Sequence, residues 1–453
     1  ESQGAEGPPN FRAMAEKLLN HRQANLYLIE ALFDDRSIQL EVFDFVIGAT
    51  QFFTRVIDPT HAYPHGNGVG KEKRLLQLPL FKINNVSELD DQDFLMSKAP
   101  SPWKYYPEFI LEGIINYVIF TVNFMGCPLV HNEDKLTAFV EFLIVLLRCP
   151  ELVGNPHMKS KLVEILFMGS LPSGGGAPFM LNIFTTDPLV RNNVRYALLD
   201  FYVMVEKTGA SSQFYDKFNS RFYDSTMVEE LWKDDLYKTQ LSDYSQNNVA
   251  FFVRFIARML NDTTYLLDES LDKLNKIHLY QVEIRAREQN PGAANIEEYG
   301  TDEELASKLA ESERIASSYT QLSNKTMDLF KLFTKEVPKG FTLSEIVDRL
   351  ASMLNYNLTV MVGPKSSKLK VRDPTVYRFD PKKTLMALVE IYCNLANESK
   401  FVEAVARDGR SFDANVFSTA TNVLSTRTTI SPVTLEKFRD FAGEAVKQKQ
   451  LDD

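Results

Sequence analysis

The chain has 453 residues, of which 44% are hydrophobic and 24% charged, and this composition is typical of a globular protein with a sizeable core. Its formal net charge of −10 argues against a general phosphate-binding surface, because proteins that bind nucleic acid usually present a net basic face. We therefore expect no nucleic-acid partner.

The cysteines and the apolar runs indicate a reducing compartment and no membrane insertion. Cys127, Cys149 and Cys393 lie far apart and form no CxxC metal pair. The most apolar run, Phe109–Phe124, is too short to cross a bilayer. The first ten residues lack a signal-peptide pattern and an initiator Met, so we expect a piece of a longer chain.

Helical periodicity dominates the first 289 residues. We predict an N-terminal helical pair (1–57), a loop-rich insertion (58–106) and a central armadillo-like part (107–289). The predicted helices are, in order, Asn10–Phe33, Ser37–Val56, Pro107–Phe124, Lys135–Leu147, Pro156–Met168, Pro188–Glu206, Gln213–Tyr237 and Asn248–Glu288. The first two are expected to pack antiparallel, and Leu171–Pro178 is expected to be a flexible connection.

The longest predicted helix, Asn248–Glu288, contains neither proline nor glycine. At about 1.5 Å per residue it would run on the order of 60 Å. One face carries residues spaced by three and four, namely Val249, Phe252, Ile256, Leu260, Thr263, Leu267, Leu271, Leu274 and His278. We expect this helix to be a central spine along which other helices stack.

The last part, 290–453, continues the helical pattern. After a break at Gln289–Gly300 we predict helices at Thr301–Thr334 and Phe341–Met361, a basic loop at Gly363–Pro374 and four short helices. No alternating strand pattern and no fixed repeat occurs. The predicted fold is therefore all-α, an elongated, irregular armadillo- or HEAT-like solenoid with one very long central helix.

Several helix starts are marked by capping residues. Asparagine, aspartate or serine precedes a proline at the first helical position at Asn155–Pro156, Asp187–Pro188, Asp380–Pro381 and Ser431–Pro432. Two capping boxes are also predicted, at Thr301 with Glu304 and at Thr342 with Glu345.

No segment carries a convincing nucleotide or metal motif. Gly66–Lys71 (GNGVGK) departs from the P-loop, because His65 stands at the first glycine position and Glu72 replaces the Ser or Thr. A flexible surface loop is the favoured interpretation. His61 and His65 are separated by Pro64, and no carboxylate or thiol is placed to complete a zinc site. We expect no metal and no cofactor.

Two cysteine–histidine pairs are conceivable as nucleophile and base. These are Cys127 with His131 and Cys149 with His157. Each cysteine precedes a proline in a predicted loop, and no third group is placed to orient the histidine. Loop or core packing is therefore the favoured interpretation of both pairs, and no catalytic residue is assigned.

Three charged residues and one histidine on the spine could bind a ligand or could stabilise the fold. Arg254, Arg258 and Asp262 stand at successive i, i+4 positions and could form a ligand clamp, although a salt-bridged strip is the commoner arrangement. His278 lies on the apolar stripe and is most simply a core histidine with satisfied hydrogen bonds.

Two segments are candidates for binding a protein partner. The basic loop carries Lys365, Lys368, Lys370 and Arg372, which could contact an acidic partner or simply be solvated. It contains no aromatic residue for base stacking, so nucleic-acid binding is not favoured. The second segment carries Trp103, Tyr105 and Tyr106, which suit an interface anchor, although a buried plug between helices is the commoner role.

Several long stretches resemble the ubiquitin chain-elongation factors, which are the ubiquitin fusion degradation class of U-box ligases. The matches are collinear over about Leu152 to Phe412 and include GPKSSKLKVRDP in the basic loop. The stretches that carry the resemblance are Leu152–Leu166, Phe201–Phe222, Asn248–His278, Phe379–Leu385 and Phe401–Phe412.

The resemblance implies an armadillo-like core followed by a U-box, which makes the parent protein a RING-type ubiquitin transferase. In that family the U-box recruits a ubiquitin-conjugating enzyme and positions its thioester for attack by a lysine. The family works with an AAA-type segregase (valosin-containing protein) and passes ubiquitylated substrates to the proteasome. We therefore expect these partners, with chaperones as further candidates, and a location in the cytoplasm and nucleus.

The chain departs from the family pattern at its end. It stops at LEKFRDFAGEAVKQKQLDD, close to where the resemblance places the start of the U-box, and nothing like that small α/β module is found. We therefore expect this segment to be inactive alone, and no catalytic residue can be carried over. The alternative is a non-enzymatic armadillo-like adaptor for protein partners.

Overall fold

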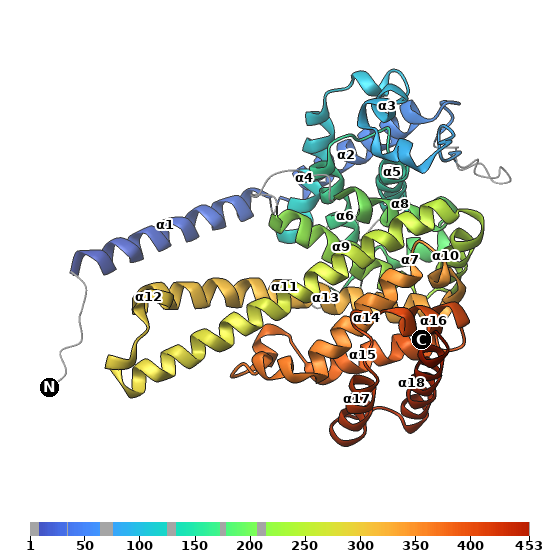
Figure 1. Ribbon diagram of the computed structural model, residues 1–453. Helices are drawn as coiled ribbons and strands as arrows, with labels where there is room; N and C mark the ends of the chain where they lie inside the picture. The colour runs from blue at the N-terminus through green and yellow to red at the C-terminus, as the bar shows by residue number, and fades with distance from the viewer. Residues whose placement is uncertain are drawn as a thin grey trace. The chain divides into compact units, whose positions relative to one another are not determined.

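The computed structural model describes residues 9–33, 35–63, 76–124, 133–172, 178–205 and 214–452. Across these ranges the ordered elements are helices and no strand occurs, which confirms the predicted all-α class (Figure 1). None of the helices described there is long and apolar enough to cross a bilayer. The chain divides into two compact units, Glu1–Leu198 and Leu199–Asp453. This boundary lies inside the predicted central part, and the four-part division stays a prediction.

The first unit is built from eight α-helices and two 3-10 turns within its described ranges. In chain order they are α1 (Pro9–Phe33), α2 (Arg36–Ile57), η1 (Val86–Asp90), α3 (Gln92–Ser97), η2 (Trp103–Tyr105), α4 (Glu108–Phe124), α5 (Glu133–Arg148), α6 (Pro156–Ser170), α7 (Leu181–Thr186) and α8 (Pro188–Met204), whose last turn crosses the boundary. Most of the predicted flexible connection Leu171–Pro178 lies outside the described residues.

Helix α5 forms the centre of the first unit. Its second half, EFLIVLL, is apolar on every face after Glu141, and this run is buried against α2 on one side and α6 on another. Glu141 is buried too, and it accepts a hydrogen bond of 2.7 Å from the Tyr63 hydroxyl. Burial, with the charge of Glu141, raises the pKa of Tyr63 and keeps the phenol neutral.

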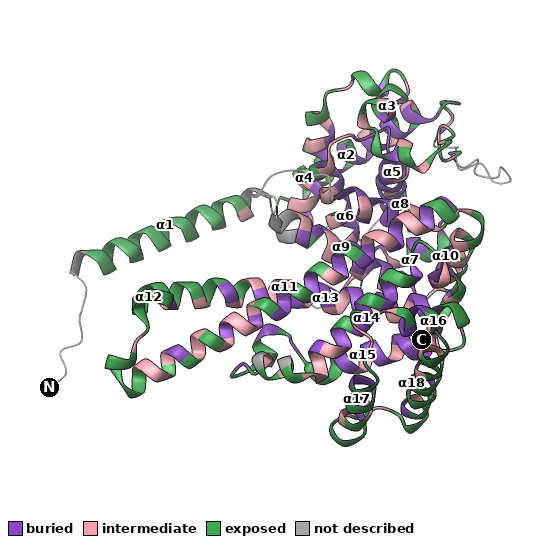
Figure 2. Ribbon diagram, in the orientation of Figure 1, coloured by how far each residue is buried: buried purple, intermediate pink, exposed green. Residues whose placement is uncertain are grey.

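Helix α1 does not pack along α2 as the predicted antiparallel pair would. Its side chains from Phe11 to Ala31 are exposed, apart from a half-buried Glu30, and Figure 2 shows this helix green along nearly all of its described length. The exposed residues include Phe11 and Leu28, at 72% and 68%. The helix therefore forms as predicted, while its apolar side chains remain uncovered by the described part of the chain.

The second unit begins with the end of α8 and contains all the later helices. These are α9 (Phe214–Leu231), α10 (Asp235–Asn247), α11 (Val249–Gln289), η6 (Pro291–Ala293), α12 (Ile296–Tyr299), α13 (Asp302–Glu336), η7 (Pro338–Thr342), α14 (Val347–Val362), η8 (Pro364–Leu369), η9 (Pro374–Tyr377), α15 (Pro381–Asn394), α16 (Ser399–Arg407), α17 (Ala414–Arg427) and α18 (Pro432–Asp452).

The predicted spine is confirmed as α11, a helix of 41 residues that lies alongside the 35-residue α13. The predicted apolar face is buried or half-buried except at Val249, which is 39% exposed. Aromatic rings join the two helices near their inner ends, where Phe255 lies 6.2 Å from Phe333 between ring centroids. Figure 2 shows burial concentrated at these inner ends and exposure at the far end of the hairpin.

The turn after α13 brings backbone close to α11. A Cβ atom at Gly340 would lie 2.8 Å from the Phe252 ring, closer than side-chain contacts allow. Glycine therefore lets η7 approach the spine, and the neighbouring Phe341 ring packs 6.1 Å from Phe252. This contact fixes how the chain leaves the long hairpin.

Two helix predictions are wrong in their extent. The predicted helix Gln213–Tyr237 is two helices, α9 and α10, because Asp234 caps a new helix start by accepting a hydrogen bond from the backbone N–H of Leu236. Buried Trp232 packs on Phe333 of α13, with ring centroids 5.0 Å apart, and holds the chain where it turns. Tertiary packing thus overrides a helical sequence at this point.

The second error is the start of the helix predicted at Phe341. Helix α14 begins at Val347, and the expected capping box at Thr342 does not form. The Thr342 hydroxyl donates to the Lys339 carbonyl, and Glu345 accepts from the Ser344 hydroxyl. The other capping box, at Thr301 with Glu304, is confirmed, and so are the four predicted capping residues Asn155, Asp187, Asp380 and Ser431.

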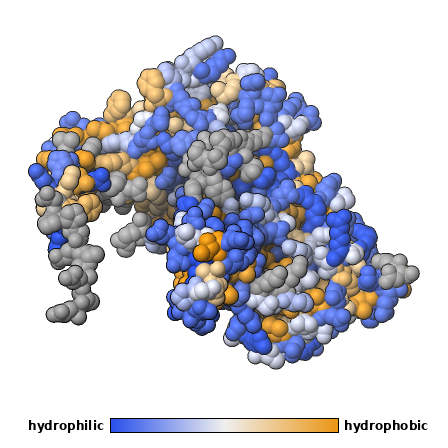
Figure 3. Space-filling model, turned by 60° about the vertical axis from the view of Figure 1, so that its left-hand side comes forward, coloured by the Kyte–Doolittle hydropathy of each residue, from blue (hydrophilic) through white to orange (hydrophobic). Residues whose placement is uncertain are grey.

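The hydropathy of the surface agrees with a protein that buries its apolar residues between helices. On the face in Figure 3, hydrophilic residues predominate and hydrophobic ones form separate patches. Inside the second unit, Leu274 of α11 is fully buried in a cluster with residues of α13, α14 and the segment after α14. A substitution in this cluster therefore tests how much it contributes to holding the spine.

We predict that Leu274→Ala lowers the free energy of unfolding by about 2–5 kcal/mol, because it leaves a cavity in a close-packed cluster. The matched control is Leu279→Ala on the same helix, where the side chain is 41% exposed and the loss should be about 0.5 kcal/mol or less. Urea unfolding followed by circular dichroism measures both variants. Equal losses would show that the spine is not held by this cluster.

Candidate partner-binding site

The predicted basic loop lies against the spine and is held there through its backbone. We call residues 364–372 the basic strap. The His278 ring Nδ1–H donates to the Lys370 carbonyl at 2.6 Å, and the backbone N–H of Arg372 donates to the Gln281 side chain at 2.9 Å. Between these two bonds Val371 is buried in the apolar cluster under α11. The strap is therefore attached to the helix at three successive residues.

The side chains of Lys370 and Arg372 are exposed although their backbone is fixed. Lys365 and Lys368 belong to η8, and their side chains lie outside the described residues. Further along, Tyr377 is buried and its hydroxyl donates to Glu313 of α13 at 2.7 Å. Burial and this carboxylate raise the pKa of Tyr377. The strap thus presents two cations on a backbone that α11 holds, and the segment after it is tied to α13 through Tyr377.

The three aromatic candidates near residue 103 have different environments. Trp103 is buried, and its ring N–H donates to the Leu152 carbonyl at 2.9 Å. Tyr106 is half-buried and packs edge-on against Phe53, at 5.3 Å between ring centroids. Tyr105 is 73% exposed. Trp103 is therefore a buried plug, and Tyr105 is the member of the three with its ring in solvent.

A small pocket of about 120 Å³ beside Trp103 contains a carboxyl group that the sequence did not single out. Glu151 is fully buried, and neither carboxyl oxygen accepts a hydrogen bond from another described residue. Burial raises the pKa of Glu151 from 4.5 to about 7, against the opposing effect of Arg148 and Lys159. The sequence offered one signal for this burial: Glu151 is a charged residue between Cys149–Pro150 and the apolar pair Leu152–Val153.

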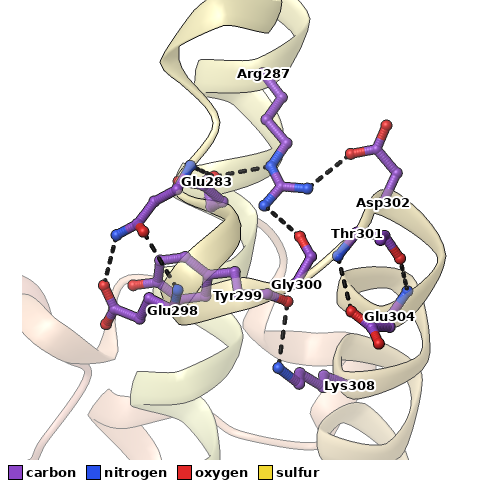
Figure 4. Close-up of polar contacts among 10 residues, drawn as sticks. Glu283, Arg287, Glu298, Tyr299, Gly300, Thr301, Asp302, Glu304 and Lys308 are labelled. Atoms are coloured by element: carbon purple, nitrogen blue, oxygen red, sulfur yellow. Dashed lines mark hydrogen bonds and ion pairs between the residues drawn. The ribbon is translucent and has the colours of Figure 1, made fainter.

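The far end of the α11–α13 hairpin is ordered by polar contacts (Figure 4). The Arg287 guanidinium donates to Glu283 at 2.8 Å, to Asp302 at 2.8 Å and to the Gly300 carbonyl at 3.0 Å. Glu283 also accepts from the backbone N–H of Asn295 at 2.9 Å. The hydrogen bond from Arg287 is the largest of the effects that lower the pKa of Glu283. One arginine thus ties both long helices to the connection between them.

The charged residues near the middle of α11 form a partly predicted arrangement. Arg258 pairs with Asp262 at 2.6 Å, as the salt-bridged strip requires. Arg254 pairs instead with Asp200 at 2.8 Å, and Arg221 of α9 approaches Asp262 at 3.3 Å. The predicted salt-bridged strip is therefore correct for Arg258 with Asp262. The other arginine at Asp262 is Arg221, which comes from a different helix.

The cysteine and histidine predictions have three outcomes. Cys149 is buried and its pKa is raised by burial, so it lacks thiolate character, and its conceivable partner His157 is exposed. Cys127 with His131, His65 and the loop Gly66–Lys71 lie outside the described residues. His278 is half-buried and satisfied, as expected, but by the strap rather than by a core neighbour.

No group of three or more His, Cys, Asp or Glu side chains in the described ranges is placed to hold a metal ion. The sequence argument missed the anchors of the strap, Gln281 and His278, and the role of Arg287. Arg287 bonds a glutamate one turn before it, but its bonds to Gly300 and Asp302 span 13 and 15 positions. His278 and Gln281 bond residues 92 and 91 positions away. Local spacing contains no signal for such contacts, and only the break at residues 289–300 hinted at the network around Arg287.

Comparison with known proteins matches residues 5–446 to the family described as the ubiquitin elongating factor core. The chain is 47% identical to the E4 ubiquitin-protein ligase UFD2 of Saccharomyces cerevisiae, over 97% of this chain and 45% of that protein. It is 40% identical to the ubiquitin conjugation factor E4 of Schizosaccharomyces pombe, over 76% and 34% respectively. A probable ubiquitin conjugation factor E4 of Arabidopsis thaliana is 31% identical over 73% and 32%. The chain spans less than half of each relative.

We predict that Arg287→Lys accelerates amide hydrogen exchange in residues 290–301 by about tenfold, because lysine keeps the charge but cannot make the three fixed hydrogen bonds of the guanidinium. Mass spectrometry of peptides covering this connection measures the rate. Arg285→Lys is the matched control, since Arg285 is exposed on the same turn and takes no part in this network. Equal rates in the two variants would contradict the role of Arg287.

Glu151→Gln should make the protein more stable than wild type above pH 7, by up to about 3 kcal/mol, because the amide removes a buried charge. The raised pKa means that the wild-type carboxyl is protonated without penalty at low pH and must ionise as the pH rises through about 7. The advantage of the variant should therefore fade as the pH falls toward 4.5, the ordinary value. Urea unfolding at several pH values measures it.

The control for this pH dependence is Glu41→Gln, which changes an exposed glutamate on α2. Its effect on the free energy of unfolding should be small and should vary little between about pH 5 and pH 8. A Glu151→Gln variant that is less stable than wild type at pH 8 would contradict a raised pKa at Glu151.

Proposed function

This chain belongs to the ubiquitin elongating factor core family, and we propose that it is the helical scaffold of a ligase that extends ubiquitin chains. The observation that carries the proposal is the family match over residues 5–446, together with relatives that are named ubiquitin ligases and ubiquitin conjugation factors. The role of the whole protein is part of the proposal, because the chain spans less than half of those relatives.

A scaffold of this kind acts by raising effective concentration. Two partners held on one scaffold meet as if their encounter were intramolecular, so the scaffold needs no nucleophile of its own. The described thiols fit this role, since Cys149 and Cys393 are buried and burial raises the pKa of Cys393 to about 12. We propose that thioester transfer is carried out by a U-box outside these 453 residues, which recruits the conjugating enzyme.

The basic strap is the proposed docking site for the AAA-type segregase. Its backbone is already ordered by His278 and Gln281, so binding there would cost little loop entropy. Its exposed cations, Lys370 and Arg372, would steer an acidic partner electrostatically. In this proposal the scaffold holds ubiquitylated substrates beside the segregase in the cytoplasm and nucleus, before they pass to the proteasome.

Calorimetric titration of the chain with the purified segregase tests this proposal. Wild type should bind with micromolar or tighter affinity, and the double variant Lys370→Glu and Arg372→Glu should weaken binding by about tenfold or more. The matched control is the double variant Lys400→Glu and Lys437→Glu, which reverses two exposed lysines on α16 and α18. The control should bind within about twofold of wild type.

Three outcomes would contradict parts of the proposal. Absence of binding, or equal weakening by both double variants, would remove the strap as the docking site. Faster discharge of ubiquitin from a charged conjugating enzyme on adding the chain would show that transfer does not require a separate U-box. Segregase binding by a parent protein that never lengthens ubiquitin chains would favour the non-enzymatic adaptor.

A further inference from the structure

A pocket of about 430 Å³ lies beside the middle of α11, where α9 and α13 meet the spine. It is distinct from the basic strap, and every residue that lines it belongs to the second unit. Its charged lining residues are Lys217 and Arg221 of α9 with Arg258 and Asp262 of α11. Three cations thus share the pocket with one carboxylate.

The carboxylate of this pocket fixes two of the cations in place. Asp262 is 4% exposed and contacts Arg258 at 2.6 Å and Arg221 at 3.3 Å. Both guanidinium groups are largely removed from water, with side-chain exposures of 25% and 11%. Because charges interact more strongly away from bulk water, an anion entering here would be attracted more than at an exposed surface. Lys217 adds a third positive charge at the same pocket.

The rest of the pocket is aromatic and aliphatic. Tyr319 is buried in a small apolar cluster with Phe218, Leu266 and Leu322. The half-exposed ring of Tyr265 packs edge-on against Tyr319, at 6.0 Å between centroids. The site therefore combines a cationic wall with an apolar surface, and a ligand that fits both must carry a negative charge next to an apolar side chain.

The pocket continues past Tyr265 into a second hollow. Asn261 and Tyr265 line both spaces, and the second, of about 690 Å³, extends between α11 and α14 toward residues 408–411. The carboxylates that line the second hollow outnumber its cations, so it does not favour an acidic group. Its charged lining residues are Asp268, Asp348 and Asp408 with Arg349 and Arg410. A single small anion would leave this space empty, whereas an extended peptide can fill both hollows.

We propose that these two hollows form one groove that binds an extended peptide segment of a protein partner, with one acidic residue in the first hollow and uncharged residues in the second. An acidic side chain of the peptide lies at Lys217, Arg221 and Arg258, and a neighbouring aliphatic or aromatic side chain packs on Tyr265 and Tyr319. The peptide then continues over Asn261 into the second hollow. This inference does not depend on the scaffold proposal, because it rests on the charge and shape of the groove alone.

Fluorescence anisotropy with labelled hexapeptide pools tests the groove on the full chain. In the acidic pool Asp or Glu stands first and Phe or Leu second, and Ser or Thr fills the other four positions. In two matched pools Ser or Lys replaces the acidic residue. The acidic pool should bind about tenfold more tightly than the Ser pool, and the Lys pool should bind more weakly still. Added salt should weaken binding of the acidic pool, because part of the attraction is screened.

Two variants test the charged and the aromatic part of the groove separately, and both leave the half-buried Arg221 and Arg258 unchanged. Lys217→Glu reverses a charge on a half-buried side chain, and Tyr265→Ala removes a ring that is 52% exposed, so both should fold. Each should weaken binding of the acidic pool by about tenfold. Lys400→Glu, the matched charge reversal outside the groove, should change it by less than about twofold.

A variant of the strap distinguishes peptide binding in the groove from binding at the proposed segregase site. Lys370→Glu with Arg372→Glu should leave peptide binding unchanged if the groove is the site. Loss of binding in that strap variant alone would assign the peptide to the strap and overturn the groove. Equal binding of all three pools, no binding at millimolar concentration, or an unaffected Lys217→Glu variant would overturn it as well.

Discussion

The lengthwise packing of α11 against α13 is the contact on which the second unit depends. Because most of the stability of a helix in a protein comes from packing its apolar face, each of these helices depends on the other to cover that face. Once paired, they offer surfaces to the other elements of the unit: α9 and α15 pack on α13, whereas α10, α14 and the strap pack on α11. Each surface described above in this unit is therefore placed by this one pair of helices.

The pair is held differently along its length. Near α9 and α14 its contacts are aromatic and apolar, with Phe330 and Phe333 fully buried. Toward the far end, where fewer helices cover it, charged and polar groups around Arg287 take over. Hydrogen bonds to charged groups are stronger than neutral ones, and the side chains of Arg287 and Glu283 are each only 10% exposed, which limits screening by solvent. The hairpin thus stays ordered where the core ends.

Sequence reasoning recovers the elements whose cause is local. The spacing of apolar residues over Asn248–Glu288 and the capping box at Thr301 predict α11 and the start of α13 to within a residue or two. Both signals act within one or two helical turns. The same reasoning joined α9 to α10, because it did not weigh the cap at Asp234 and could not see that Trp232 packs on Phe333, about a hundred residues later.

The candidate sites were less predictable for the same reason. Basic residues in the strap could be identified from sequence, but not the fact that His278 and Gln281 hold its backbone. The groove beside α11 needs Lys217 and Tyr319, which lie on different helices, so no motif links them. Trp103 is the buried plug that was the commoner of its two expected roles. The environment of Glu151 is set partly by residues that are distant in the sequence.

The contacts along α11 also limit where residues can be inserted into this protein or deleted from it. Each residue of an α-helix turns the chain by about 100°, since 3.6 residues complete one turn. One residue inserted near Phe255 would therefore rotate the rest of the helix relative to its start. His278 and Gln281 would then face away from the strap, and Arg287 would lose Gly300 and Asp302. A helix with partners at its beginning, middle and end has a fixed residue count. We therefore expect insertions and deletions to be tolerated in the connections between helices rather than within α11.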